Sequence, residues 1–301
     1  MQVPAQVEYE RASSVEHALS LLARYAPGAR ILAGGHSLIP MMKLRLAQPE
    51  VLIDINRIGA LRYVERTSAE LRIGALARHA DLLASQAAGD HFAILHDAER
   101  VIADPVVRNW GTIGGSLCQA DPSEDLSAAF AALKGSMIIH GAAGSRKVSA
   151  RAFHTGPYET VVGPTEMLTE IRLPIRPNFG SAYVKVMRRA GDWPIGAAGG
   201  AVRLDGDLIA DAGIGLTAVG AAHFVAAEAE EFLRGQPAGE QSFARAGEIA
   251  AEHCNPPSDQ RGPADYKRHL VRELTARVLR AAVGRARGLE PAGGLAGGLS
   301  P

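Results

Sequence analysis

Two short glycine-rich segments constrain this chain more than any other feature of its sequence. The first is ILAGGHSLIP at residues 31–40, and the second is RNWGTIGGS at residues 108–116. In each we expect an apolar strand to lead into a Gly-Gly turn with a hydroxyl residue beside it. Because glycine has no Cβ, backbone N–H groups in such a turn can approach a ligand closely, and consecutive N–H groups form a concave nest for anions. Two nests in one fold predict a site that holds both phosphates of a dinucleotide.

The predicted phosphate site uses backbone N–H groups of the glycines together with side-chain hydroxyls. Either segment alone has the composition of an ordinary turn, and His36 alone is typical of a packed or solvent-facing imidazole. The two segments together favour a phosphate site, with hydroxyl contacts from Ser37, Thr112 and Ser116. The full set of residues predicted to contact the ligand here is Ala33, Gly34, Gly35, His36, Ser37, Leu38, Thr112, Ile113, Gly114, Gly115 and Ser116.

The motifs of the commonest nucleotide-binding and hydrolytic enzymes are absent from the sequence. No G-x-G-x-x-G follows a strand and opens a helix, which argues against a Rossmann nicotinamide site. No G-x-x-x-x-G-K-[ST], H-E-x-x-H or G-x-S-x-G occurs either, which argues against P-loop, metalloprotease and common hydrolase functions. The 32 basic residues balance the 32 acidic ones, so nucleic acid is not an expected partner.

The cysteine content and the hydropathy predict a cytoplasmic protein. The 2 cysteines, Cys118 and Cys254, are far apart and form no C-x-x-C, so neither a disulfide framework nor an iron–sulfur site is expected. No signal peptide is visible, and no apolar run reaches the ~18 residues that a membrane helix needs. Contact with a membrane is expected only through a partner, and no metal ligands are predicted in this chain.

Turn-forming residues divide the predicted elements into domains. Pro174, Pro177 and Gly180 interrupt the chain after a predicted strand, and we place a domain boundary there. An antiparallel sheet followed by helices is expected beyond it. The last residues are almost all Gly, Ala, Pro and Leu, and are expected to be disordered. The predicted units are residues 1–176, with subdomains at about 1–56 and 57–176, then residues 177–287, and a tail at 288–301.

Further candidate residues lie beyond the two glycine segments. Asp121 and Asp125 flank a helix that is predicted to start at Leu126. Capping of that helix is one expected role; the other, compatible with it, is that Asp125 accepts hydrogen bonds from ribose or ribityl hydroxyls. Lys185 lies in a predicted strand, either on a solvated face or beside a reduced flavin whose anion it would stabilise. Trp193 follows a Gly-Asp turn, where it could cover a flat ring.

Four segments in the same order resemble the FAD-binding medium subunits of molybdenum hydroxylases, the family of xanthine dehydrogenase. They read AGGHSLIPMMKLRLAQPEVLIDI, IADPVVRNWGTIGGSLCQADPSEDLSA, RRAGDWPIGAA and SDQRGPADYKRHL. Within the family, the chain is most similar to the medium subunit of aerobic carbon monoxide dehydrogenase, and the similarity covers residues 1 to about 287. It implies an α+β fold: a FAD-binding domain of the vanillyl-alcohol-oxidase (PCMH) type with two subdomains, then a C-terminal α+β domain with an antiparallel sheet and helices.

The resemblance also implies a cofactor and the positions that hold it. Both glycine segments would bind the FAD pyrophosphate and adjoining groups, and Asp125 the ribityl region. Leu168 would pack near the adenine, while Lys185 and Trp193 would lie near the isoalloxazine. No residue of this chain is expected to be catalytic, because the sequence offers no convincing acid–base pair for substrate chemistry.

The implied function is electron transfer within a complex. A large subunit would hold the molybdopterin cofactor and a small subunit two [2Fe–2S] clusters, in a dimer of heterotrimers, that is, a heterohexamer. Electrons would pass from those clusters through FAD in this chain to an external acceptor, expected to be quinone, with carbon monoxide as the substrate at molybdenum. The open alternatives are the medium subunit of a related N-heterocycle or aldehyde dehydrogenase, a stand-alone flavin oxidoreductase, and a cofactor-free scaffold subunit.

Overall fold

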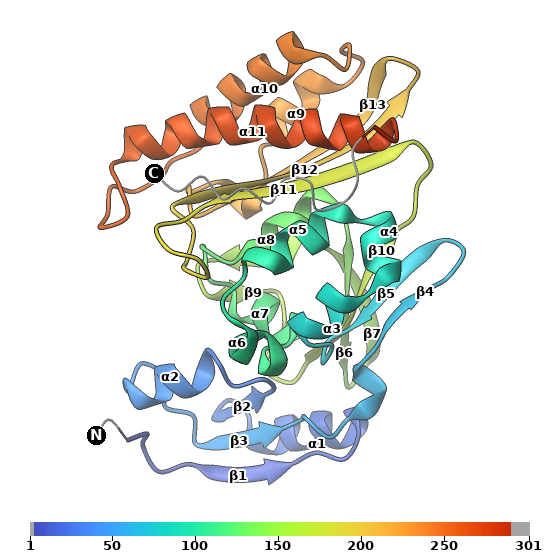
Figure 1. Ribbon diagram of the computed structural model, residues 1–301. Helices are drawn as coiled ribbons and strands as arrows, with labels where there is room; N and C mark the ends of the chain where they lie inside the picture. Colours follow the sequence, from blue (N-terminus) through green and yellow to red (C-terminus); the bar gives the residue numbers. More distant parts are fainter. Residues whose placement is uncertain (1–2, 290–301) are drawn as a thin grey trace.

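The N-terminal residues form a small parallel sheet, at the base of the molecule in Figure 1. The structure, a computed structural model, describes residues 3–289 of the chain. The strands lie in the order β1-β3-β2, with bounds Glu8–Arg11, Val51–Asp54 and Ala29–Leu32, and both pairings are parallel. Helix α1 (Val15–Tyr25) packs its apolar side against this sheet, and the short helix α2 (Leu38–Lys43) follows β2.

The middle tier is built on a 5-stranded antiparallel sheet. Its strands, in the spatial order β4-β5-β10-β6-β7, are Val64–Arg66, Glu70–Gly74, Met167–Pro174, Ser136–Gly141 and Gly144–Ser149. The helices beside this sheet are α3 (His79–Ala84), α4 (Gln86–His91), α5 (Ala93–Val101), α6 (Pro105–Trp110), α7 (Ile113–Gln119) and α8 (Asp125–Ala132). The smaller elements are β8 (His154–Gly156), β9 (Glu159–Thr160) and the 3-10 helices η1 (Gly59–Leu61), η2 (Ala150–Ala152) and η3 (Ala222–Phe224). Every residue of α8 is buried, which explains its small and mostly apolar sequence DLSAAFAA.

The top tier is an antiparallel sheet whose two faces are both covered by helices. Its strands are β11 (Phe179–Val186), β12 (Gly196–Asp205) and β13 (Leu208–Thr217). Helices α9 (Ala227–Leu233), α10 (Glu240–Glu252) and α11 (Ala264–Ala286) cover one face, and α5 and α8 approach the other (Figure 1). A Cβ added to Gly215 of β13 would lie 1.9 Å from the carbonyl oxygen of Ala128 in α8. The glycine is therefore needed for close packing of this helix on the sheet.

The observed architecture confirms the expected fold class, with an antiparallel C-terminal sheet covered by helices. The sequence pattern does not predict the edge strands β1 and β7, because their residues are mostly exposed and polar. It also does not predict the short helix α6. The N–H of Gly288, the first residue of the expected tail, donates to the Arg285 carbonyl at 3.0 Å. Residues 290–301 of that tail lie outside the described residues. No helix within residues 3–289 is both long and apolar enough to cross a bilayer.

Candidate functional site

The first glycine segment is a turn that leads from β2 into α2. Gly35 has a φ of +80°, a conformation that glycine adopts without the steric cost of a Cβ. His36 and Ser37 are exposed. Within the described part of the chain, none of the N–H groups of residues 34–38 donates a hydrogen bond to a protein acceptor, and the Ser37 side chain makes no capping bond to α2. The turn therefore presents the clustered, unpaired donors that an anion site requires.

The second glycine segment is not the turn that the sequence predicts. It forms the start of helix α7, and the hydroxyl oxygen of its N-cap, Thr112, accepts the N–H of Gly115 at 3.1 Å. The N–H of Gly114 donates to the Ala75 carbonyl at 2.9 Å. The interpretation of this segment as a second nest of free N–H groups is wrong, because these donors are used inside the protein. Packing explains the first glycine of the pair: a Cβ on Gly114 would lie 2.6 Å from the Cβ of Ala75.

The two glycine segments lie directly against each other. A Cβ added to Gly34 would lie 2.3 Å from the carbonyl oxygen of Trp110 and 2.8 Å from the Cα of Gly111. A Cβ added to Gly115 would lie 3.9 Å from the Cβ of Ala33. Only a hydrogen atom at position 34 lets the two backbones meet this closely. The unpaired N–H groups therefore begin at the contact between the segments.

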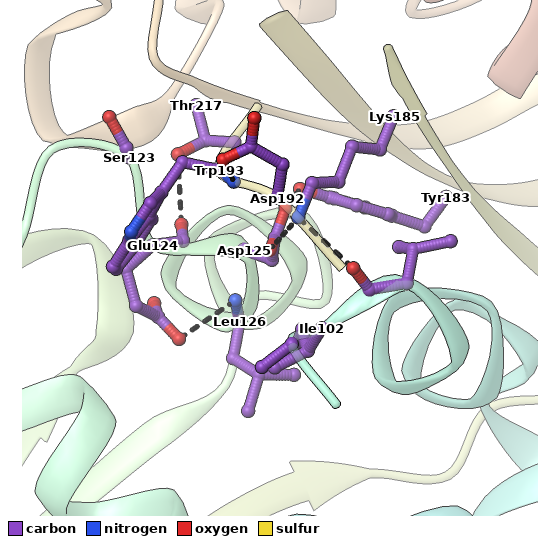
Figure 2. A network of polar contacts seen from close by, with 12 residues as sticks. Ile102, Ser123, Glu124, Asp125, Leu126, Tyr183, Lys185, Asp192, Trp193 and Thr217 are labelled. Atoms are coloured by element: carbon purple, nitrogen blue, oxygen red, sulfur yellow. Dashed lines mark hydrogen bonds and ion pairs between the residues drawn. The ribbon is translucent and has the colours of Figure 1, made fainter. Parts of the chain in front are cut away.

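A buried polar network lies between α8 and β11 (Figure 2). The Lys185 Nζ donates to Asp125 Oδ2 at 2.8 Å and to the Val101 carbonyl at 3.1 Å, while the Tyr183 hydroxyl donates to Asp125 Oδ1 at 2.7 Å. Tyr183 and Lys185 are two positions apart in β11, so both side chains project from the same face of that strand. Asp125 and Lys185 are each 5% exposed. The alternative that placed Lys185 on a solvated face is therefore wrong.

Burial and charge together determine the protonation of this network. Burial raises the pKa of Asp125, and the positive charge of Lys185 opposes that rise. Burial and the negative charge of Asp125 raise the pKa of Tyr183 well above its ordinary value. Tyr183 therefore stays a hydrogen-bond donor, and Lys185 supplies the charge that compensates the buried carboxylate.

The N-cap of helix α8 is Glu124, and the expectation that Asp121 or Asp125 caps this helix is wrong. The Glu124 carboxylate accepts the N–H of Leu126 at 3.0 Å. It also accepts the hydroxyl of Ser116 at 3.0 Å, so the start of α8 is tied to α7. The Ser116 hydroxyl, predicted to contact a ligand, is thus hydrogen-bonded within the protein.

Leu168 and Trp193 lie in very different surroundings. Leu168 is buried in the core of the middle tier, opposite Ile139 of β6. Trp193 is 46% exposed between β11 and β12, and its carbonyl accepts the Arg261 Nη1 at 2.7 Å. Within residues 3–289, neither residue is hydrogen-bonded to a glycine segment. Their expected contacts with the adenine and flavin rings stay predictions.

Several polar residues around the site are missed by the sequence analysis. Tyr183 has a usable signal, because it precedes Lys185 by two positions in a predicted strand. Asn56 and Arg78, which link the two glycine segments by hydrogen bonds, have none, because their contacts arise only in the folded chain. In the described part of the chain, no group of three or more His, Cys, Asp or Glu residues could hold a metal ion.

Two protein-family models match the chain. The one described as the FAD binding domain in molybdopterin dehydrogenase matches residues 5–176. The one described as the CO dehydrogenase flavoprotein C-terminal domain matches residues 181–282. The first match thus covers the lower two tiers of the fold, and the second covers most of the upper tier.

Known proteins match over nearly the full length of the chain. The glyceraldehyde dehydrogenase medium chain of Sulfolobus acidocaldarius is 36% identical over 277 residues, which cover 92% of this chain and 98% of that protein. The carbon monoxide dehydrogenase medium chain of Hydrogenophaga pseudoflava is 37% identical over 284 residues, covering 94% and 99%. The solved carbon monoxide dehydrogenase from Hydrogenophaga pseudoflava matches with a TM-score of 0.91 and 38% identity, over 94% of this chain and 99% of that chain.

Proposed function

Because the chain belongs to the family of FAD-binding medium subunits of molybdenum hydroxylases, we propose that it transfers electrons within a complex of the carbon monoxide dehydrogenase type. FAD, when bound, supplies chemistry that can take up electrons singly and release them as a pair. The work of this chain is to hold that cofactor and to set the charges around it. The sequence offers no convincing acid–base pair for substrate chemistry of its own.

The first glycine segment fits a diphosphate. Phosphate oxygens without protons only accept hydrogen bonds, and the N–H groups of residues 34–38 are donors without a protein acceptor in the described residues. The exposed Ser37 lies within the same turn and adds a hydroxyl. These unpaired donors, set against the second glycine segment, are the observation that carries the proposal.

We propose that the second glycine segment forms a wall of the same site. Its N–H groups are engaged, but Gly115 is only half-buried and lies beside Ala33, so a ligand held by the first segment would rest against it. Asp125 can still accept a ribityl hydroxyl, because a carboxylate has about four lone-pair positions and two are used here. The proposed FAD contacts are Ala33, Gly34, Gly35, His36, Ser37, Leu38, Thr112, Ile113, Gly114, Gly115, Ser116, Asp125, Leu168, Lys185 and Trp193.

The proposed FAD-binding domain covers residues 1–176, and the proposed C-terminal domain covers residues 177–287. The support is that the middle sheet receives its last strand, β10, just before this boundary, and the upper sheet starts with β11 just after it. The subdomains of the first domain, about 1–56 and 57–176, each contain their own sheet.

The proposed partners are a large subunit with the molybdopterin cofactor and a small subunit with two [2Fe–2S] clusters, in a dimer of heterotrimers. Relatives that are named medium chains of dehydrogenases support a multi-subunit complex. Quinone is the proposed acceptor. The free thiols of Cys118 and Cys254 suit a reducing compartment, which supports a cytoplasmic complex.

Carbon monoxide is the proposed substrate of the complex, on the similarity to carbon monoxide dehydrogenase medium chains in sequence and fold. Oxidation of an aldehyde is the second candidate. It is favoured by the glyceraldehyde dehydrogenase medium chain, whose 36% identity is nearly the same. In both cases the substrate would react in another polypeptide, so the activity of the complex distinguishes the two candidates.

Purification of the chain and of its complex tests the proposed FAD binding and the proposed activity. The full-length chain should bind FAD, absorb near ~450 nm through the flavin, and show no turnover without its partners. A chain that takes up no added FAD would overturn the proposal, and turnover by the isolated chain would favour a stand-alone flavin oxidoreductase. The complex captured with this chain should reduce a quinone with carbon monoxide, whereas reduction with glyceraldehyde alone would support the second candidate.

A further inference from the structure

A series of hydrogen bonds connects the two glycine segments through Asn56 and Arg78. The Asn56 Nδ2 donates to the Ala33 carbonyl at 2.7 Å, and the Arg78 Nη2 donates to Asn56 Oδ1 at 2.8 Å. The Arg78 Nη1 donates to the Trp110 carbonyl. A Cβ on Gly34 would overlap that same carbonyl, so the series closes at the point where the two segments touch.

Neighbouring contacts fix the orientation of both linking residues. The N–H and the Nδ2 of Asn56 each donate to Asp54 Oδ1 at 2.8 Å. The N–H of Arg78 donates to Asp81 Oδ2 at 3.0 Å, and Arg78 forms an antiparallel backbone bridge with Thr112. The Asn56 side chain and the Arg78 backbone are therefore each held by neighbouring residues. This rigidity suits residues that set a distance between two segments.

Arg78 is also a buried cation whose side-chain hydrogen bonds go to neutral oxygens. It is 8% exposed, and its guanidinium lies 5.7 Å from the ring centroid of Trp110. Its described side-chain partners are a backbone carbonyl and the amide oxygen of Asn56. A buried positive charge is costly unless an anion offsets it. The Asp81 and Asp54 carboxylates already attract this charge, and a diphosphate on the unpaired N–H groups of residues 34–38, next to Ala33, would attract it further.

We propose that Arg78 is a positioning residue, which through Asn56 sets the separation of the two glycine segments and places a positive charge beside the bound diphosphate. This inference rests on the proposed FAD function and deepens it. Asn56 follows β3 of the first tier and Arg78 precedes α3 of the middle tier, so their hydrogen bond fixes one tier against the other at the site.

Titration of the full-length apoprotein with FAD tests this role. Arg78→Ala should weaken FAD binding about tenfold to a hundredfold, the usual effect of deleting hydrogen bonds from a charged group. Asn56→Ala should weaken FAD binding similarly. The double variant, Arg78→Ala with Asn56→Ala, should bind FAD about as tightly as whichever single variant has the lower affinity. Arg245→Ala is the control, because Arg245 lies in α10 of the upper tier, where its Nη1 donates to Glu248 at 2.8 Å. This control should bind FAD like the wild type.

The Arg78→Lys variant distinguishes the effect of the hydrogen-bond bridge from the effect of the positive charge. Lysine keeps the charge, but its ammonium group cannot reproduce the planar fork of the guanidinium. We expect Arg78→Lys to bind FAD more weakly than the wild type but more tightly than Arg78→Ala, because it loses the bridge and keeps the charge. Wild-type affinity in Arg78→Lys, or additive losses in the double variant, would overturn the proposal.

Stability measurements on the same samples exclude a merely structural effect. A lower melting temperature of the apoprotein with unchanged FAD affinity in the folded Arg78 variants would overturn the positioning role. If Arg78→Ala does not fold, the Arg78→Lys and Asn56→Ala titrations decide the question. A wild-type chain that binds no FAD would refute the proposed function instead, so the two failures are distinguishable.

Discussion

Replacing Gly34 by alanine adds one methyl group at the contact between the two glycine segments. The new Cβ would lie 2.3 Å from the Trp110 carbonyl oxygen and 2.8 Å from the Gly111 Cα. Comfortable contacts between carbon atoms are about 3.5 Å or longer, so one segment must move roughly 1 Å relative to the other. Both opposing atoms belong to backbone, so no side chain can rotate away. The turn with the unpaired N–H groups would therefore move away from the C-terminal end of α6.

The expected magnitudes differ for folding and for FAD binding. Overpacking of this kind costs about 1–3 kcal/mol of folding free energy, which a chain of this size can tolerate. A misplacement of about 1 Å in positioned groups can cost about 100-fold in function, and we expect a loss of that order in FAD affinity. Gly114 is a poorer test of the site, because a Cβ there would lie 2.6 Å from Ala75 and disturb the packing of α7.

The assay is a titration of full-length apoprotein with FAD, followed by flavin fluorescence, with urea denaturation of the same samples. Gly59→Ala is the matched control, because the described structure places no atom within 4 Å of the Cβ that it adds. The control should bind FAD like the wild type. A folded Gly34→Ala chain with wild-type FAD affinity would refute the reasoning that contact between the segments defines the site.

Other predictions test the packing and charges around the site. Lys185→Met should lower the free energy of unfolding in urea by about 3–5 kcal/mol, because Asp125 loses its partner at 2.8 Å. Adding Asp125→Asn to this variant should restore part of the lost stability. Strictly additive losses of stability from the two substitutions would contradict the pairing. Gly215→Ala should lower the melting temperature, because its Cβ would lie 1.9 Å from a carbonyl oxygen of α8; an unchanged value would contradict the close packing. The hydrogen bond from Arg146 lowers the pKa of Glu166 from 4.5 to about 2. The stability that it contributes is present above pH 4.5 and is lost as the pH falls through about 2. This loss, up to about 1 kcal/mol, should be absent from acid denaturation of Glu166→Gln.

The second glycine segment shows where local sequence reasoning fails. A Gly-Gly pair favours a turn, because glycine is a poor helix former. Tertiary packing decides otherwise here, since the close approach of Ala75 requires a residue without a Cβ at position 114. The hydroxyl of Thr112, three residues before Gly115, is a recognisable N-cap signal for the helix that forms. That signal was in the sequence, but the glycine pattern pointed to a turn.

The candidate site was only partly accessible from the sequence for a related reason. The nest at residues 34–38 is local, and its glycines, turn and following helix can be read along the chain. The pairing of Asp125 with Lys185 joins residues that are 60 positions apart, and both were expected to contact the cofactor separately. The bond between Asn56 and Arg78 joins the residue two positions after β3 in the first tier to the N-cap of α3 in the middle tier. Neither contact has a signature in local periodicity, because each depends on how the sheets are stacked.

A crystal structure of the full-length chain with bound FAD tests the central claim most directly. We predict diphosphate oxygens within about 3.2 Å of the backbone nitrogens of residues 34–38, with Arg78 still bridging Asn56 and the Trp110 carbonyl. A diphosphate that binds elsewhere and leaves these N–H groups without an acceptor would contradict the assignment of this turn as the FAD site.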